Sequence, residues 1–317
     1  MISSRHSQAV AGSIPAAVLG LALAATMPTA GLQAKEITVT HPQGETVITG
    51  TPQTVITTDW AVFDNLDALG IAVAGVPSSN TPGYLADRVT DDLLRVGSLQ
   101  EPDVEGIVAE NPDLLIVAAR SRTSYPTFAP LLPTIDASVD NNDLIASVEA
   151  QITLFGEIFD VEDAAARLVE NLDAKVAEAR EAVAGQGSAL VIVTNGGKLG
   201  IYGPGSRISW AYNELGLPSV FDTVDDSDHG GDAISFEYLL ETDPDWLLVV
   251  DRDAAVGNEG AARQLLDNEL IHETGFWQND RIIYLDPEAA YITMHGYHAL
   301  MLLLDQVIAG FTDSAAG

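Results

Sequence analysis

Cysteine is absent from this 317-residue chain, and basic residues are scarce. Without a thiol the chain has no disulfide, no thiolate metal site and no N-terminal cysteine to carry a lipid. Only 14 basic residues, three of them lysines, oppose 46 acidic ones, and the formal net charge is −32. A surface of this kind repels nucleic acid and anionic membranes, which excludes nucleic acid as a partner.

Motifs of the common enzyme classes are missing as well. We find no nucleophile elbow, phosphate loop, metalloprotease helix or dinucleotide fingerprint. The stretch "NGGKLGIYGPG" is rich in glycine but lacks the strand–GxGxxG–helix context of a nucleotide site. The sequence therefore predicts neither an enzyme nor a protein with an intrinsic cofactor.

The acidic residues are spread evenly through a sequence that is otherwise foldable, with 47% hydrophobic residues. Self-repulsion of such a surface is screened by salt. This distribution, together with the shortage of lysine, favours a halophile-like acidic surface from a high-salt habitat. An ordinary acidic secreted protein is the alternative.

The N-terminal 34 residues predict a cleavable secretory signal peptide. Arg5 and His6 precede an apolar run, residues 14–27, and small residues follow as far as Ala34 in "GLQA-KE". The run is too short and too interrupted for a membrane span. We expect a soluble periplasmic protein that is not a lipoprotein.

The rest of the chain alternates between strand-like and helix-like patterns and predicts an α/β fold. After a short hairpin, an N-terminal lobe covers residues 35–141. A long stretch that favours helix, residues 142–185, connects it to a C-terminal lobe, residues 186–317, and is expected to bend near Asp160. We predict two Rossmann-like lobes with mostly parallel sheets, joined by one long helix.

One phrase occurs twice, once in each lobe. "VEGIVAENPDLLIVAAR" (residues 104–120) and "FEYLLETDPDWLLVVDR" (residues 236–252) agree at six of seventeen positions at an offset of 132 residues. Each copy predicts a helix, a Pro-Asp turn and a strand buried on both faces, and each ends on an arginine.

These two arginines, Arg120 and Arg252, follow buried strands, and Arg207 lies in the glycine-rich loop "YGPGSR". Ligands of open parallel sheets bind beyond the carboxyl ends of the strands. A single arginine after a strand is more often a surface ion-pair residue, but three at such positions lead us to expect that their side chains face a cleft between the lobes. Guanidinium groups suit an anionic, carboxylate-rich or catecholate-rich ligand.

Imidazole and phenolate groups can bind ferric iron that has open coordination positions. His229 in the loop "DDSDHGGD" and Tyr291 after the strand "RIIYLD" are candidates. Solvation of His229 and packing of Tyr291 are the plainer interpretations. His295 and His298 have the spacing of a metal pair, but no carboxylate lies at the right spacing.

The stretches "YGPGSRISWAYNELGL", "HGGDAISFEYLLETDPDWLLVVDRDAAVG" and "ENPDLLIVAAR" resemble the iron-siderophore substrate-binding proteins of ABC importers. The resemblance covers nearly all of the mature chain and is strongest to the branch that binds catecholate-type ferric siderophores. It implies that Arg120, Arg207 and Arg252 hold the anionic chelate and that His229 and Tyr291 complete the coordination of iron. Arg122 lies on the same loop as Arg120 and could take its place.

The resemblance also implies partners. Glu105 and Glu237, which are equivalent in the two copies, would each dock onto the transmembrane subunits of an ABC permease. We expect a monomer whose ligand is a ferric siderophore. Binding of haem, cobalamin or a hydroxamate siderophore is the alternative within the family. A secreted α/β hydrolase and a surface adhesin are alternatives from other classes.

Overall fold

The computed structural model describes residues 35–221, 223–225 and 230–314. The predicted signal peptide, residues 1–34, and His229 lie outside the described residues. The described chain begins with the predicted hairpin, formed by the antiparallel strands β1 (Glu36–His41) and β2 (Gly44–Thr49).

The N-terminal lobe is built on a five-stranded sheet in which every pairing is parallel, in the order β5-β4-β3-β6-β7. Its strands β3 and β6 are wholly buried and, apart from Thr57, apolar, as expected of strands covered on both faces. The register places Ile56 opposite Leu115. The strands are β3 (Val55–Thr57), β4 (Gly75–Val76), β5 (Leu94–Arg95), β6 (Leu114–Val117) and β7 (Thr134–Asp136).

Short helices surround this sheet. They are α1 (Trp60–Ala68), α2 (Val104–Glu110) and α3 (Tyr125–Phe128), with the 3-10 helices η1 (Gly83–Arg88), η2 (Ala119–Ser124) and η3 (Asn141–Asp143). Helix α1 begins where the carboxylate of Asp59 accepts hydrogen bonds from the amides of Ala61 and Val62. This is a helix N-cap, which satisfies backbone donors that would otherwise have no partner.

The C-terminal lobe has a mixed sheet in the order β10-β9-β8-β11-β12. Strands β8, β11 and β12 are parallel, whereas β9 runs antiparallel to both β8 and β10. The reversal follows from a two-residue turn, Gly196-Gly197, whose φ angles of 56° and 78° suit glycine. The strands are β8 (Ala189–Asn195), β9 (Lys198–Tyr202), β10 (Asp232–Ile234), β11 (Trp246–Asp251) and β12 (Ile282–Tyr284).

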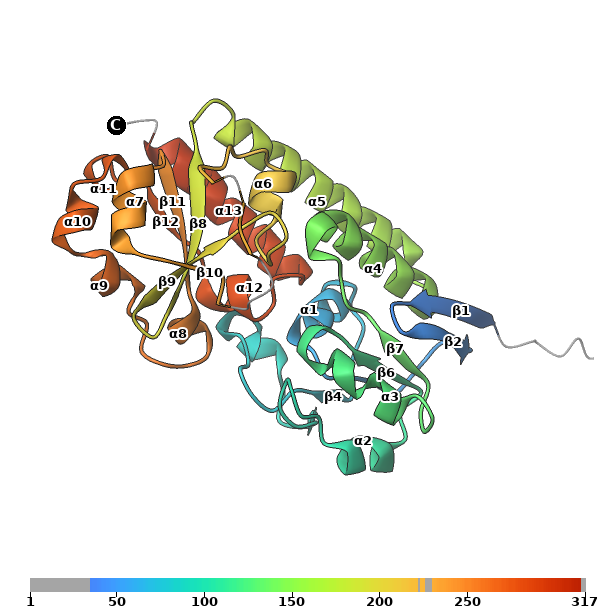
Figure 1. The fold of residues 1–317 in the computed structure, drawn as a ribbon. Coiled ribbons are helices and arrows are strands. Elements are labelled where there is room, and N and C mark those ends of the chain that lie inside the picture. Colours follow the sequence, from blue (N-terminus) through green and yellow to red (C-terminus); the bar gives the residue numbers. More distant parts are fainter. Residues whose placement is uncertain (1–34, 222, 226–229, 315–317) are drawn as a thin grey trace, which may run out of the picture. The chain divides into compact units, whose positions relative to one another are not determined.

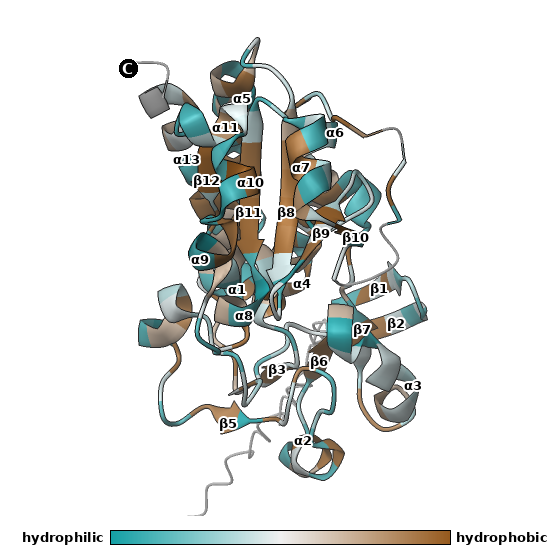
Figure 2. Ribbon diagram, turned by 60° about the vertical axis from the view of Figure 1, so that its left-hand side comes forward, coloured by the Kyte–Doolittle hydropathy of each residue, from teal (hydrophilic) through white to brown (hydrophobic). Residues whose placement is uncertain are grey.

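Eight helices of the described chain belong to this lobe or follow it. They are α6 (Trp210–Asn213), α7 (Phe236–Thr242), α8 (Arg252–Ala255), α9 (Ala262–Leu266), α10 (Glu269–His272), α11 (Gly275–Gln278), α12 (Pro287–Tyr291) and α13 (Tyr297–Ser314). Figure 2 shows the strongly hydrophobic strands β8 and β11 between more hydrophilic helices, the arrangement expected of a buried parallel core.

Between the lobes the chain forms two helices, α4 (Leu144–Phe159) and α5 (Glu162–Val183), which lie side by side (Figure 1). The predicted bend is a break at Asp160, where the left-handed backbone, with φ 57°, ends α4. Helix α5 packs against both α4 and α13. The two α/β lobes and the parallel N-terminal sheet agree with the predicted fold. The single long helix is wrong, because the break at Asp160 divides it into two packed helices, and the C-terminal sheet is mixed because the chain reverses between β8 and β9. The exact boundaries at residues 141 and 185 stay predictions.

One hydrophobic core runs through both lobes. A single cluster of contacting buried side chains includes Val55 and Ile116 of the first sheet, Val191 and Leu248 of the second, and Leu303 of α13. A shared core of this kind opposes movement of one lobe against the other. Among the described residues, no helix combines the length and the hydrophobicity needed to cross a membrane.

Candidate ligand-binding cleft

The two copies of the repeated phrase form the same local structure. A seven-residue helix, α2 or α7, ends on a residue with a left-handed backbone, Asn111 (φ 51°) or Asp243 (φ 33°), and Pro-Asp leads into β6 or β11. The prediction of helix, turn and buried strand is therefore confirmed in both lobes. The carboxyl ends of these strands deliver the arginines to the same part of the structure.

The aspartate of each Pro-Asp pair has a role that the pattern did not reveal. Oδ2 of Asp113 accepts hydrogen bonds from the amides of Gln53 and Thr54, at 2.9 and 2.8 Å, directly before β3. Oδ2 of Asp245 accepts a hydrogen bond from the amide of Ser188 at 2.7 Å, directly before β8. Each carboxylate thus fixes the start of the neighbouring strand, and the architecture alone explains this part of the repeat.

The backbone carbonyl of Tyr291, at the end of α12, accepts hydrogen bonds from arginines of both lobes. Arg120 donates from Nη2 to this oxygen at 2.6 Å and from Nη1 to the carbonyl of Ile292 at 3.3 Å. Arg207 donates from Nη1 to the same Tyr291 oxygen at 2.9 Å. One arginine from each lobe therefore holds one carbonyl.

The third predicted arginine contacts the side chain of the same tyrosine. Arg252 donates from Nε to the Tyr291 hydroxyl at 2.9 Å and from Nη1 to Oδ1 of Asn195 at 3.0 Å. The guanidinium carbons of Arg120, Arg207 and Arg252 lie 5.4, 4.3 and 5.5 Å from the centre of the Tyr291 ring. The structure therefore brings together four of the five predicted ligand-binding residues, and the fifth, His229, lies outside the described residues.

A cavity of about 400 Å³ opens beside this cluster. Arg120, Arg122 and Arg207 line it together with His295, so both lobes contribute to its wall. Sequence reasoning left open whether Arg120 or Arg122 faces the cleft, and both do. Arg252 is not among the lining residues and donates its hydrogen bonds to Tyr291 and Asn195 instead.

The charges in this cluster repel one another. Burial, followed by the nearby charge of Arg207, lowers the pKa of Arg120, and the carboxylate of Asp59 opposes that shift in part. Burial raises the pKa of Tyr202, whose ring lies under Arg207, to about 12, so its hydroxyl stays neutral at neutral pH. Cationic groups held close together in a partly desolvated site favour an anionic ligand, because the ligand offsets their repulsion.

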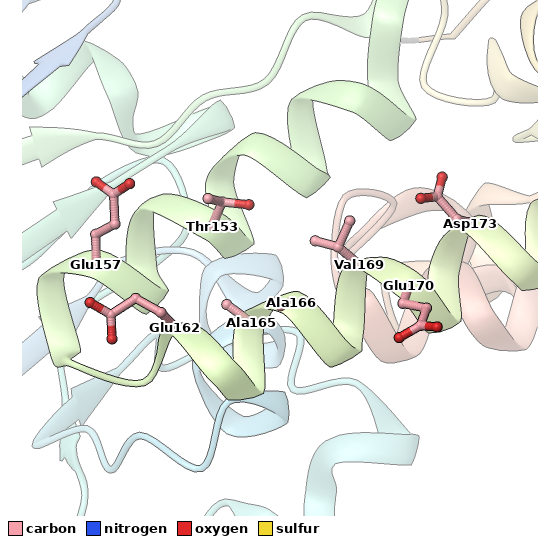
Figure 3. A pocket seen from close by; sticks show the side chains of 8 residues that line it. All are labelled: Thr153, Glu157, Glu162, Ala165, Ala166, Val169, Glu170 and Asp173. Atoms are coloured by element: carbon pink, nitrogen blue, oxygen red, sulfur yellow. The ribbon is translucent and has the colours of Figure 1, made fainter.

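A second, larger cavity differs from the arginine-lined one in the charge of its lining residues. It lies between α4 and α5, measures about 560 Å³ and is drawn in Figure 3. Its charged lining residues are all acidic: Glu157, Glu162, Glu170 and Asp173. An anionic ligand would be repelled there, so the arginine-lined cavity is the better candidate site for such a ligand despite its smaller volume.

The histidines near the start of α13 do not act as a pair. Nε2 of His295 lies 3.3 Å from Oδ1 of Asp59, whereas Nδ1 of His298 lies 2.8 Å from Oδ1 of Asp64. Within the described part of the chain, no group of three or more His, Asp or Glu side chains could hold a metal ion. These histidines therefore have separate carboxylate partners.

Sequence reasoning missed Asn195 and Asp59, and it considered His295 only as a metal ligand paired with His298. Asn195 ends β8, so the rule that identified the arginines could have found it. Asp59 and His295 belong to different lobes and meet only through the fold, and no local signal predicts their contact.

The two glutamates have equivalent positions. Glu105 and Glu237 are each the second residue of a seven-residue helix, and both are exposed. The Glu237 carboxylate accepts hydrogen bonds from its own amide and from Ser235, which lower its pKa. Both carboxylates therefore face solvent at a helix N-terminus, where a negative charge is stabilised.

Comparison with known proteins agrees with this architecture. A family model described as "Periplasmic binding protein" matches residues 55–289, and the chain belongs to this family. It is 32% identical over 281 residues to the petrobactin-binding protein YclQ of Bacillus subtilis, and the aligned region covers 87% of this chain and 88% of that protein. It is 30% identical to the ferric-anguibactin-binding protein FatB of Vibrio anguillarum, over 87% of each chain.

A solved structure gives the same result. The periplasmic catecholate-siderophore binding protein VctP from Vibrio cholerae superimposes with a TM-score of 0.81 at 32% identity, covering 88% of this chain and 100% of that chain. These findings confirm the family resemblance seen in the sequence. The family consists of binding proteins, so the chain is a binding protein and not an enzyme.

Proposed function

We propose that this protein captures a ferric siderophore, of the catecholate type, in the arginine-lined cleft and delivers it to an ABC permease. The observation that carries the proposal is the convergence of Arg120, Arg207 and Arg252 on Tyr291 from three different parts of the fold. The named ligands of the relatives, petrobactin and anguibactin, and the catecholate siderophore of the similar structure support an iron chelate.

The chemistry of the cleft favours a ligand with several anionic oxygens. A guanidinium group presents a planar set of donors that can hold two oxygens at once. In a protein of formal net charge −32, the four arginines that line one cavity of about 400 Å³ or belong to the adjoining cluster are a local exception. Arg120, Arg122 and Arg207 would contact the chelate directly, while Arg252 would orient Tyr291.

In this proposal Tyr291 and His229 bind iron only when the siderophore leaves coordination positions open. The Tyr291 hydroxyl accepts the hydrogen bond from Arg252, so this arginine fixes the position of the phenol oxygen beside the cluster. The ligand is cargo, and the protein itself has no resident cofactor.

Export and docking complete the proposed function. The N-terminal 34 residues direct the chain to the periplasm and are removed. Glu105 on α2 and Glu237 on α7 dock onto the permease, one from each lobe, because both are exposed and have the same place in the repeat. The binding protein acts as a monomer.

Titration of tryptophan fluorescence with a panel of ferric siderophores, haem and cobalamin tests the ligand class. We expect saturable quenching by ferric catecholates and weaker binding of ferric hydroxamates, which carry less negative charge. Cobalamin, a ligand without that charge, should bind weakly or not at all. Tight binding of haem or cobalamin, with no response to any ferric catecholate, would show that the proposed ligand is wrong.

A further inference from the structure

One buried polar side chain in the wall of the cleft has not been assigned a role. His295 lines the arginine-lined cavity, and its side chain is 0% exposed. Within the described part of the chain neither ring nitrogen has a hydrogen-bond partner of good geometry. A buried polar group without a partner costs stability, so its presence calls for an explanation.

Asp59 faces one side of this ring. Its Oδ1 lies 3.3 Å from Nε2 of His295 and also accepts the amides of Ala61 and Val62, which fix the carboxylate at the start of α1. Burial acts to raise the pKa of Asp59, but His295, Arg120 and the Val62 amide outweigh it and lower that pKa. An ionised Asp59 therefore faces Nε2 of His295, while the buried Nδ1 has no partner among the described residues.

The other charges around His295 are those of the cavity wall. Arg120, Arg122 and Arg207 line the same cavity, and Asp59 is the carboxylate that pairs with the ring. Three residues further along the chain, His298 is paired with Asp64 and is not among the residues of that wall. His295 therefore faces one carboxylate and shares a cavity wall with three guanidinium groups, a setting in which an added anion changes the balance of charge.

We propose that His295 is a specificity-determining contact that takes up one proton from solvent when an anionic ligand enters the cleft, with Asp59 as its positioning residue. The proposal rests on the proposed function, because the ligand is the anionic chelate. A neutral imidazole carries a single N–H, and with that N–H directed at Asp59 its Nδ1 lone pair repels an anionic oxygen. Protonation turns Nδ1 into a donor, while Nε2 keeps its N–H toward Asp59.

The test measures affinity and proton uptake with one probe, the ferric complex of a hexadentate tris-catecholate. The variants are His295→Phe, which removes both nitrogens, and His295→Gln, which keeps polarity without a titrating ring. Asp59→Asn retains a helix cap but removes the charge. The matched control is His298→Gln. It alters the other His–Asp pair, His298 with Asp64, and leaves the cavity wall unchanged.

Imidazole changes charge between about pH 5 and pH 8, so affinity is compared at about pH 8 and about pH 6. At the higher pH, the wild type and His295→Phe should differ by about threefold or less. At the lower pH the variant should bind about tenfold more weakly, since uptake of one proton changes affinity by at most about tenfold per pH unit. Protonation of the ligand itself cancels, because each comparison is made at a single pH.

Calorimetry in buffers of different ionisation enthalpy gives the second measurement. The wild type and His298→Gln should take up a fraction of a proton more than either His295 variant, and Asp59→Asn should take up less than the wild type. Equal weakening of His295→Phe at both pH values, with unchanged proton uptake, would overturn the proposal and leave the proposed function intact. Failure of the wild-type protein to bind any ferric catecholate would overturn both. If His295→Phe does not fold, the uptake measured with His295→Gln decides the question.

Discussion

In the N-terminal lobe, residues 104–120 fold into α2 and β6, and in the C-terminal lobe residues 236–252 fold into α7 and β11. Both copies have a left-handed residue after the helix and an aspartate that binds the start of the neighbouring strand. They differ after the strand. Arg120 lies in a 3-10 helix that begins at Ala119, a non-glycine residue with φ 42°, whereas Arg252 is the first residue of α8.

This difference changes what each arginine does. Arg120 reaches across to carbonyls of the other lobe, while Arg252 bonds two side chains of its own lobe, Asn195 and Tyr291. The repeated sequence thus places an arginine directly after the buried strand in each lobe. The local structure that follows the strand then determines which groups this arginine contacts. Equivalent positions in a repeat do not imply equal contributions to binding.

The first prediction separates the two arginines by affinity. Arg120→Ala should weaken binding of a ferric catecholate by about 2–5 kcal/mol, roughly 30-fold to several-thousand-fold, because a charge-assisted contact in a desolvated cavity is lost. Arg252→Ala should cost about tenfold, since Arg252 acts through Tyr291 and does not line the cavity. Fluorescence titration of both variants measures the two dissociation constants.

Two further variants make this comparison specific. Arg120→Lys keeps the charge without the planar donor set, so it should recover only part of the affinity. Arg167→Ala removes an exposed arginine of α5 and should bind like the wild type. If Arg120→Ala and Arg252→Ala weaken binding equally, the distinction between the lobes is wrong. If neither weakens it, the arginines are ordinary ion-pair residues.

The sequence was sufficient for the features that depend on local pattern. Apolar runs such as that of β6 predict buried strands, and proline and glycine mark where helices end, so both lobes and the repeat could be predicted. The antiparallel direction of β9 could not be predicted. The Gly196-Gly197 turn reverses the chain within a region whose alternation of strands and helices indicates parallel strands.

The candidate site was predictable only in part, for a related reason. Arg120, Arg207 and Arg252 were found because strand ends can be located in a sequence. That they share one tyrosine, and that Asp59 contacts His295, depends on how the lobes pack, and residues 59 and 295 are far apart in the chain. Contacts of this kind have no periodic signal.

The second prediction compares the lobes as docking surfaces. Glu105→Ala and Glu237→Ala should each reduce permease-dependent uptake of ferric siderophore by about tenfold or more, because a charge at an interface is lost, and leave the affinity for the siderophore unchanged. Uptake is measured in cells or vesicles that contain the cognate permease. Glu110→Ala in α2 and Glu241→Ala in α7 are matched controls, since both residues are exposed on the same helices.

Each glutamate has its own outcome in this experiment. Normal transport by one variant would mean that only the other lobe docks through its glutamate. Normal transport by both would show that these are solvated surface residues of an acidic protein.

The last prediction concerns the shared aspartates and has the smallest effect. Hydrogen bonds from the amides of Thr54 and Gln53 lower the pKa of Asp113. A carboxyl whose pKa is lower in the folded state stabilises the fold at pH values above its unfolded pKa of about 4. That stability is lost as the pH falls through the folded pKa. Asp113→Asn should therefore lower the free energy of unfolding at neutral pH, and the difference from the wild type should shrink in acid.

Because Asp113 is exposed, solvent screening limits this effect to about 1 kcal/mol. Urea denaturation at about pH 7 and below about pH 4 measures it, with the exposed Asp87→Asn as the control. Asp245→Asn should cost a similar amount at neutral pH, since Asp245 binds both the amide and the hydroxyl of Ser188. A full loss that persists in acid would mean that the charge of Asp113 is irrelevant and that only the shape of its side chain supports the strand. In that case the two lobes would share the geometry of the Pro-Asp turn but not its electrostatics.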